Sequence, residues 1–167
     1  RLVVKGTEEE NAGKYRTGNV VITGSDHTPP DVGEIPALMK DLIEWIKKNR
    51  KELHTIELAA ILHHKLVWIH PFFDGNGRAA RLAMNLILMQ TGYPLVVILK
   101  NDRKKYYETL AKSDKGNYLP FVRFIAQAVE RSMNIYLKTL LPASVKKEKF
   151  LPLSEISKQT PYSEKYL

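Results

Sequence analysis

The 167-residue sequence contains no cysteine. Disulfide frameworks, thiolate nucleophiles and cysteine-based zinc sites are therefore excluded. A chain without thiols suits a reducing compartment. From the absence of cysteine and from a C-terminal segment of bacterial type, we expect a cytoplasmic, bacterial protein.

Long apolar runs are also missing. The longest candidate, residues 91–99, is interrupted by Gly92 and Pro94 and falls short of the roughly 20 residues that cross a bilayer. We therefore expect no membrane partner. Nothing reads as a signal peptide, and the sequence starts at Arg1 rather than at Met, so we expect a fragment of a longer chain.

Acidic residues are in the minority. The chain has 26 Lys and Arg against 18 Asp and Glu, which gives a formal net charge of +8. Such a surface attracts phosphates on a nucleotide, a nucleic acid or an acidic partner. Most of these charges suit an ordinary solvated surface, because runs such as Lys146 and Lys147 are remote from any candidate site. Hydrophobic residues make up 44%, which is enough for the packed core of one domain.

The hydrophobic pattern predicts a mainly α-helical domain with a short β-hairpin flap. Residues 13–23 favour extended chain and residues 24–31 are rich in turn formers, which places the flap at about 19–31. Helices are predicted from Pro36 onwards and over about 55–69, 78–91, 102–114 and 120–140. The helix at 55–69 is apolar on most sides and is expected at the centre. The last helix is expected to bury Phe121, Phe124, Ile125, Ala128, Met133 and Tyr136.

Residues 70–81, HPFFDGNGRAAR, carry the densest set of reactive side chains. Gly75 and Gly77 flank Asn76 and lead directly into a predicted helix. Glycines let the backbone approach a ligand closely, and a helix N-terminus offers unpaired N–H groups and partial positive charge. The sequence therefore predicts an anion cradle at this point.

Charged side chains surround the predicted cradle. Arg78 and Arg81 share one face of the helix, and two guanidinium groups indicate a polyphosphate rather than a single carboxylate. Asp74 is placed to hold Mg²⁺, which takes one or two carboxylates together with phosphate oxygens and water. His70 is placed to serve as a general base near neutral pH. A Walker P-loop and a Rossmann fingerprint are both excluded, because the Lys-Ser/Thr pair is absent and the preceding element is a predicted helix.

These twelve residues match the signature of the Fic family, His-Pro-Phe-x-Asp/Glu-Gly-Asn-Gly-Arg-x-x-Arg, at every defined position. The similarity extends from about Gly13-Lys-Tyr-Arg through His27-Thr-Pro-Pro to about Leu141. Residues 121–126 resemble those of animal endoplasmic-reticulum members and their bacterial relatives. The resemblance implies a Fic-type helical bundle over residues 1–141. The lysine-rich composition that follows indicates a linker at 142–151, and the pattern of residues 152–167 indicates the start of a truncated helix-turn-helix-like module.

The resemblance also implies an activity, protein adenylylation, in which AMP passes from ATP to a Ser, Thr or Tyr hydroxyl of a target protein and pyrophosphate is released. His70 would deprotonate that hydroxyl, and Asp74 would ligate Mg²⁺ on the phosphates. The α- and β-phosphates would be held by Gly75, Asn76 and Gly77, with help from Arg78. Arg81 would reach the γ-phosphate.

The same resemblance places an adenine pocket and a target-binding flap. Tyr106 and Tyr107 fall where the family lines its adenine pocket, although they equally suit plain core aromatics. Asp114 falls where relatives often carry Asn, so we assign it no contact with the base. The flap that holds the target segment corresponds to Gly24, Ser25, Asp26 and His27.

The remaining histidines are interpreted as structural. His63 and His64 are adjacent on one predicted helix and cannot both face one ligand, and His54 stands alone. Asn85 shares the helix face of Arg81 and is expected to be a hydrogen-bond partner behind the site.

Several alternatives remain open at this stage. Removal of AMP, or transfer of UMP or phosphocholine, would use the same side chains, whereas Gly77 argues against a kinase branch that carries Lys there. A nucleic-acid-binding regulator is the second alternative, based on the basic charge and residues 152–167, which would bind DNA.

The oligomeric state and the regulation are less readily predicted. A dimer is compatible with the sequence. Residues 6–11 and 160–164 match the inhibitory pattern of many Fic proteins only in part, so an inhibitory segment is expected upstream.

Overall fold

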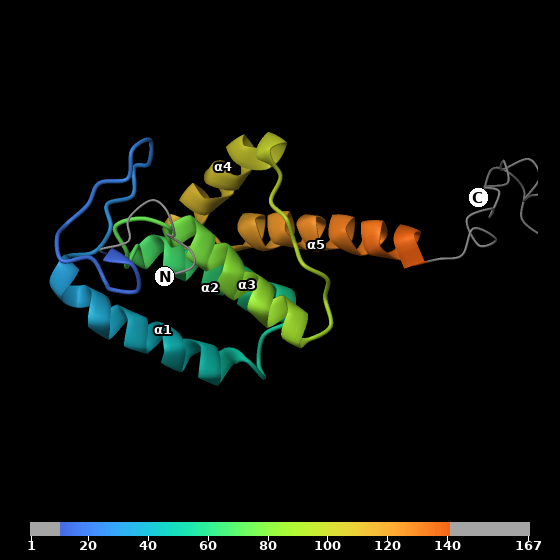
Figure 1. Ribbon diagram of the computed structural model, residues 1–167, viewed down its shortest axis with the longest axis horizontal. Helices are drawn as coiled ribbons and strands as arrows, with labels where there is room; N and C mark the ends of the chain where they lie inside the picture. The colour runs from blue at the N-terminus through green and yellow to red at the C-terminus, as the bar shows by residue number, and fades with distance from the viewer. Residues whose placement is uncertain (1–10, 141–167) are drawn as a thin grey trace, which may run out of the picture. The chain divides into compact units, whose positions relative to one another are not determined.

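The computed structural model describes residues 11–140, and five helices account for most of them (Figure 1). They are α1 (Ile35–Asn49), α2 (Thr55–Ile69), α3 (Asn76–Gln90), α4 (Arg103–Asp114) and α5 (Leu119–Leu140). Short 3₁₀ turns, η3 (Val32–Glu34) and η4 (Lys100–Asp102), precede α1 and α4. The predicted helices are confirmed, and the largest difference at a helix start is in α3, which begins at Asn76 rather than at about residue 78. The predicted linker and C-terminal module lie outside the described residues.

The chain divides into two units between Asn134 and Ile135, and all the site residues described below belong to the first. Within residues 11–140, no helix is long and apolar enough to cross a membrane.

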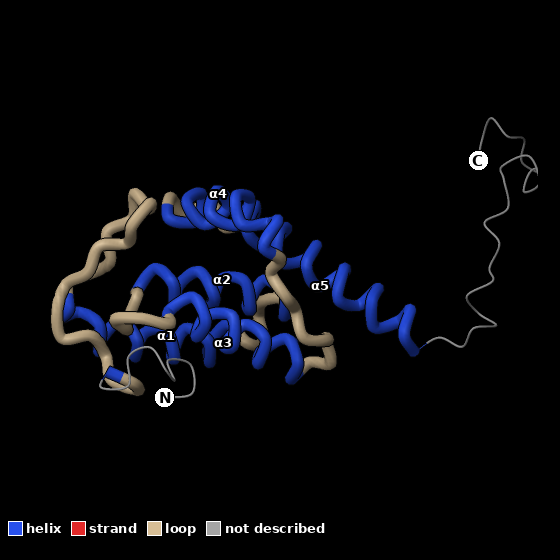
Figure 2. Tube along the Cα trace, turned by 45° about the horizontal axis from the view of Figure 1, so that its top comes forward, coloured by secondary structure: helices blue, strands red, loops and turns tan. Residues whose placement is uncertain are grey.

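Helix α2 is the central element of the first unit, as predicted. It lies beside α1 and α3 (Figures 1 and 2) and contributes to two apolar clusters. One cluster joins α2 to α3, α4 and α5, and its members include Ala59, Ala60, Met84, Leu88, Tyr106, Phe121 and Ile125. The other joins α2 to α1 and α3 through Ile35, Leu42, Leu62, Leu66, Ile69 and Ala80. Helix α2 is therefore buried on two sides.

The predicted core stripe of α5 holds only in its first half. Phe121, Phe124, Ile125 and Ala128 are buried, together with Val129. The expected burial of Met133 and Tyr136 is wrong, because these side chains are 40% and 60% exposed. The apolar periodicity continues into the exposed second half of the helix, so the pattern alone could not locate where burial ends.

The predicted flap is a loop rather than a β-hairpin. No strand occurs among residues 11–140, and the segment before η3 is drawn as loop (Figure 2). Its two limbs are tied by side chains: Asn19 Nδ2 donates to Asp31 at 2.9 Å, and Asn19 Oδ1 accepts from the Val32 amide at 2.8 Å. The physical reason is that Pro29 and Pro30 in the return limb have no N–H to donate to a ladder.

Asn85 fixes the chain that follows α3. Its side chain forms a pair of hydrogen bonds with Val96, in which Nδ2 donates to the carbonyl at 3.0 Å and Oδ1 accepts from the amide at 2.7 Å. Asn85 thus supports the site as expected, because these two hydrogen bonds hold the segment around Val96 alongside α3, near Arg81.

Candidate functional site

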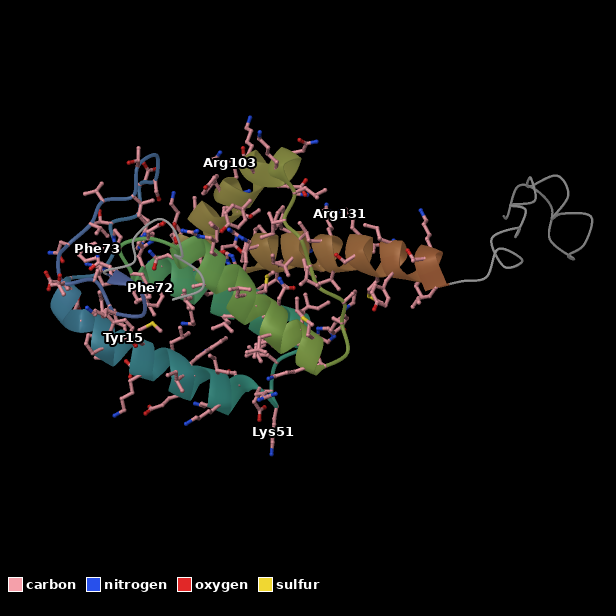
Figure 3. All side chains as sticks on the ribbon, in the orientation of Figure 1. Tyr15, Lys51, Phe72, Phe73, Arg103 and Arg131 are labelled. Carbon is pink, nitrogen blue, oxygen red and sulfur yellow. The ribbon has the colours of Figure 1, made fainter. Side chains whose placement is uncertain are left out.

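The loop between α2 and α3 is organised from within by Asn76. This side chain is only 3% exposed, and both of its polar atoms bind Phe72: Oδ1 accepts from the amide at 2.9 Å and Nδ2 donates to the carbonyl at 2.7 Å. Phe72 also packs near Tyr15, with ring centres 6.1 Å apart (Figure 3). The Asn76 side chain therefore shapes the loop, so the group that it can offer to an anion is its backbone N–H at the start of α3.

Each glycine of the motif has a structural reason. Gly75 occupies the N-cap position of α3 with φ = 82°, in the left-handed region that other residues rarely adopt. A Cβ added to Gly77 would lie 3.2 Å from Arg81 Nη1. The first glycine thus permits the turn into the helix, and the second permits close approach of the arginine, so the helix N-terminus stays open as a place for phosphate oxygens.

Asp74 lies at the solvent edge of this helix N-terminus. One carboxylate oxygen, Oδ1, accepts from the Gly75 amide at 2.6 Å, and the other, Oδ2, pairs with Arg78 Nη2 at 2.6 Å. The side chains of Arg78 and Asp74 are 42% and 45% exposed, so the pair is weak and open to competition from a bound ion. Within residues 11–140, no group of three or more His, Cys, Asp or Glu side chains is arranged to hold a metal.

His70 ends α2 in a strained conformation. With φ = 51° and ψ = 56°, it is the one non-glycine residue with positive φ among those described. Such conformations cost free energy and are found preferentially at active sites. The ring Nδ1 lies 3.3 Å from the Val67 carbonyl, which can only accept a hydrogen bond, so Nδ1 carries the proton and Nε2 keeps its lone pair.

The environment of His70 favours the neutral imidazole. Burial lowers the pKa of its ring, the Val67 hydrogen bond opposes this effect, and the neighbouring Arg16 and His27 lower the pKa further. A neutral ring with a free Nε2 has the protonation state that a general base requires.

Arg16 holds His70 in place and was not identified from the sequence as a site residue. It is 2% exposed, and its Nε donates to the His70 carbonyl at 2.9 Å. Its Nη groups donate to the Gly18 carbonyl at 2.9 Å, to Asn19 and to the Pro30 carbonyl. The Arg16 amide also donates to the Pro71 carbonyl at 2.9 Å. One buried guanidinium thus joins the flap loop to the strained residue.

Of the four predicted flap residues, the structure brings His27 to the site. Its Nε2 lies 2.8 Å from the Trp68 carbonyl, and its ring stacks on Trp68 with centres 5.3 Å apart. Gly24, Ser25 and Asp26 form the exposed tip, where Gly24 adopts φ = 78° and the Ser25 hydroxyl accepts from the His27 amide. His27 is therefore the anchor of the flap loop on α2, next to His70.

A cleft of about 280 Å³ lies between α3 and α4. It contains three of the predicted nucleotide ligands, Arg81, Tyr106 and Tyr107. The cleft is also lined by two positively charged residues that were not predicted from the sequence, Lys100 and Arg103. The remaining lining residues are Ile98 and Leu99. Arg103 lies over the Tyr107 ring at 5.7 Å, and Figure 3 shows this arginine on α4. The cleft thus combines aromatic surface with a strong positive field.

The two adjacent histidines of α2 are both buried, but they have different neighbours. His64 Nε2 lies 2.8 Å from Asp114 Oδ1, so the Asp114 carboxylate makes a structural contact with α2. Burial lowers the pKa of His64, against the opposing effect of Asp114. His63 instead faces Tyr106 of the cleft, with its Nε2 3.4 Å from the tyrosine hydroxyl.

Known proteins share this combination of sequence and fold. The sequence model of the Fic/DOC family matches residues 1–88. A Nematostella vectensis protein named protein adenylyltransferase Fic is 47% identical over 138 residues, which are 82% of this chain and 32% of that protein. An Aedes aegypti protein of the same name is 43% identical over 82% of this chain and 27% of that protein. The chain thus spans about a third or less of the length of these relatives.

Solved structures agree with the sequence comparison. Fic-1 of C. elegans (residues 134–508) superposes with a TM-score of 0.72 at 36% identity, over 80% of this chain and 39% of that one. A Fic-domain-containing signalling protein of Bacteroides thetaiotaomicron gives 0.68 at 34% identity, over 75% and 54% of the two chains. The motif at 70–81, the helical fold and these matches agree, and the chain belongs to the Fic/DOC family.

Proposed function

We propose that this chain is the catalytic part of a protein adenylyltransferase, which transfers AMP from ATP to a hydroxyl of a target protein. The observation that carries the proposal is the loop between α2 and α3. His70, with a strained backbone and a neutral ring, begins this loop, and the N-terminus of α3 at Asn76 ends it. The names of relatives at 43–47% identity support the same activity.

The start of α3 is the proposed phosphate site. Backbone N–H groups of Asn76, Gly77 and Arg78 belong to the first helical turn, which has no earlier carbonyls to bind. They would hold the α- and β-phosphates. Arg81 lies beside Gly77 and lines the cleft, so it would bind the γ-phosphate, while Tyr106 and Tyr107 would contact the adenine.

His70 is the proposed general base. Its Nε2 takes the proton of the target hydroxyl, and the hydroxyl oxygen forms a bond with the α-phosphorus. The bond between the α-phosphorus and the oxygen that bridges to the β-phosphate breaks, and pyrophosphate leaves. The chain mainly contributes orientation of the two reactants and stabilisation of the charge on the phosphates.

The donor set also fits Mg²⁺. A single half-exposed carboxylate, Asp74, stands next to the phosphate site, and Mg²⁺ typically takes one or two carboxylates and completes its shell with phosphate oxygens and water. Asp74 would hold the ion, and Arg78, released from the ion pair, would turn to the phosphates. When bound, the ion supplies positive charge that offsets the charge of the leaving pyrophosphate.

Position-specific labelling of ATP tests the proposed reaction. The protein is incubated with a lysate, Mg²⁺ and ATP that carries the isotope either on the α- or on the γ-phosphate. AMP transfer predicts that target protein becomes labelled from the α-position only. Label from the γ-position would instead identify a kinase, and label from neither would overturn the proposal.

The pH dependence of the reaction follows from the environment of His70. Because burial lowers the pKa of this imidazole, the base stays neutral below the ordinary histidine value of about 6.5. We expect kcat/KM for ATP, which reports the free enzyme, to rise with pH and to reach half of its plateau below pH 6.5. A half-maximal value reached only above pH 6.5 would contradict the assignment of a lowered pKa to the base.

A further inference from the structure

His63 is a costly residue for its position. Its side chain has no exposed surface, and it packs edge-on to Tyr106 and close to Phe121, with ring centres 5.7 Å and 5.3 Å away. Its Nδ1 has no hydrogen-bond partner among the described residues. An unpaired buried polar atom costs free energy of folding, and an aliphatic side chain would avoid that cost. Core packing alone therefore does not explain an imidazole here.

Tyr106 connects His63 to the cleft. The tyrosine is 7% exposed and lines the cleft together with Arg81. Burial raises the pKa of Tyr106 to about 12, while the charge of Arg81 and a hydrogen bond from it act in the opposite direction. Burial, and after it the charge of Arg81, lowers the pKa of His63 to about 3. The three side chains therefore form one group that links α2, α3 and α4.

The hydrogen-bonding capacities of the three groups fix the direction of the contacts. Arg81 and Tyr106 line the same cleft, and because a guanidinium can only donate, the group that Tyr106 offers to Arg81 is the acceptor lone pair of its hydroxyl oxygen. The hydroxyl proton is then available to His63 Nε2, 3.4 Å away, which accepts it in the tautomer that carries the ring proton on Nδ1. On the other side, Arg81 Nη1 lies 3.2 Å from the place of a Cβ on Gly77. Arg81 is thus confined between the start of α3 and the Tyr106 hydroxyl.

We propose that His63 is a positioning residue, which acts through the Tyr106 hydroxyl to hold the Arg81 guanidinium where it binds the distal phosphates of the nucleotide. The inference rests on the proposed function and adds to it a buried residue outside the motif at 70–81. Without the acceptor at His63, the Tyr106 hydroxyl turns freely, and Arg81 loses the partner that keeps it directed into the cleft.

The test compares the affinities of ATP and AMP by calorimetry, in the presence of Mg²⁺. His63→Leu removes the acceptor, Tyr106→Phe removes the hydroxyl, and His63→Gln keeps a polar atom near the Nε2 position. We expect both His63→Leu and Tyr106→Phe to weaken ATP about tenfold, a factor that corresponds to about 1.4 kcal/mol. His63→Leu should leave AMP within about twofold, because His63 does not line the cleft. The glutamine variant should retain most of the affinity for ATP. Combining His63→Leu with Tyr106→Phe should cause no further loss, because both act through one contact.

His64→Leu is the matched control, because it removes the neighbouring buried histidine and its contact with Asp114 but leaves Tyr106 untouched. It should lower stability without changing the ratio of the two affinities. Equal losses of ATP and AMP affinity in His63→Leu, or additive losses in the double variant, would overturn the inference. If His63→Leu does not fold, His63→Ala and Tyr106→Phe decide together, and the inference is overturned unless both weaken ATP to a similar degree. A native protein that binds no ATP would refute the proposed function itself.

Discussion

Replacing His70 with alanine should lower the rate of AMP transfer by about 100-fold to 10,000-fold, the usual contribution of a general base. Binding of ATP should change little, because the proposed phosphate ligands are the backbone of α3 and Arg81. The neutral ring, with Nδ1 facing the Val67 carbonyl, leaves Nε2 as the atom that takes the proton. Incorporation of α-labelled AMP into target protein measures the first effect, and calorimetry with ATP measures the second.

The backbone conformation of His70 calls for a second variant. Alanine tolerates positive φ poorly, so His70→Ala combines loss of the base with added strain in the loop. Asparagine adopts the left-handed region more readily, so His70→Asn removes the base with less strain. Both variants should lose transfer to the same degree. Transfer at near the native rate in His70→Asn would mean that the residue is needed for the shape of the loop and not for proton transfer.

The parts of the site that lie close together in sequence were predictable. Gly75 and Gly77 mark the turn into α3, and Arg78 and Arg81 follow at helical spacing, so one short segment carries both the local structure and the chemistry. The apolar pattern of α2 likewise placed it at the centre. Signals of this kind arise from neighbours within a few residues, which is the range over which sequence patterns are informative.

The parts that depend on distant segments were not predictable. Arg16 binds a carbonyl 54 residues away, and His63 meets Tyr106 across 43 residues. In the sequence, an arginine in a loop cannot be distinguished from an ordinary surface residue, and a histidine on an apolar helix cannot be distinguished from an ordinary core residue. The loop form of the flap was missed because the β-branched residues of one limb suggested a strand, whereas Pro29 and Pro30 of the other limb cannot donate to a ladder and the Asn19 side chain joins the two limbs instead.

Arg16→Met should be the most destabilising single change among the residues of the site. The methionine has a similar length and fills the same space, but it leaves the carbonyls of Gly18, Pro30 and His70 without their donor. A buried acceptor that loses its partner costs about 1–3 kcal/mol, and because these three acceptors are only partly buried we take the lower end for each and expect a loss of about 3 kcal/mol. For a domain of this size, that lowers the melting temperature by roughly 6–12 °C. Thermal unfolding followed by circular dichroism measures the shift.

Two further variants separate the geometry of Arg16 from its charge. Lys14→Met removes an exposed positive charge from the same segment and should leave the melting temperature nearly unchanged. Arg16→Lys keeps the charge, but a single ammonium cannot reach the several acceptors that the planar guanidinium joins, so most of the loss should remain. Full stability in Arg16→Lys would show that the charge suffices. The hydrogen bonds to the flap loop and to His70 would then not be what keeps the base in its strained conformation.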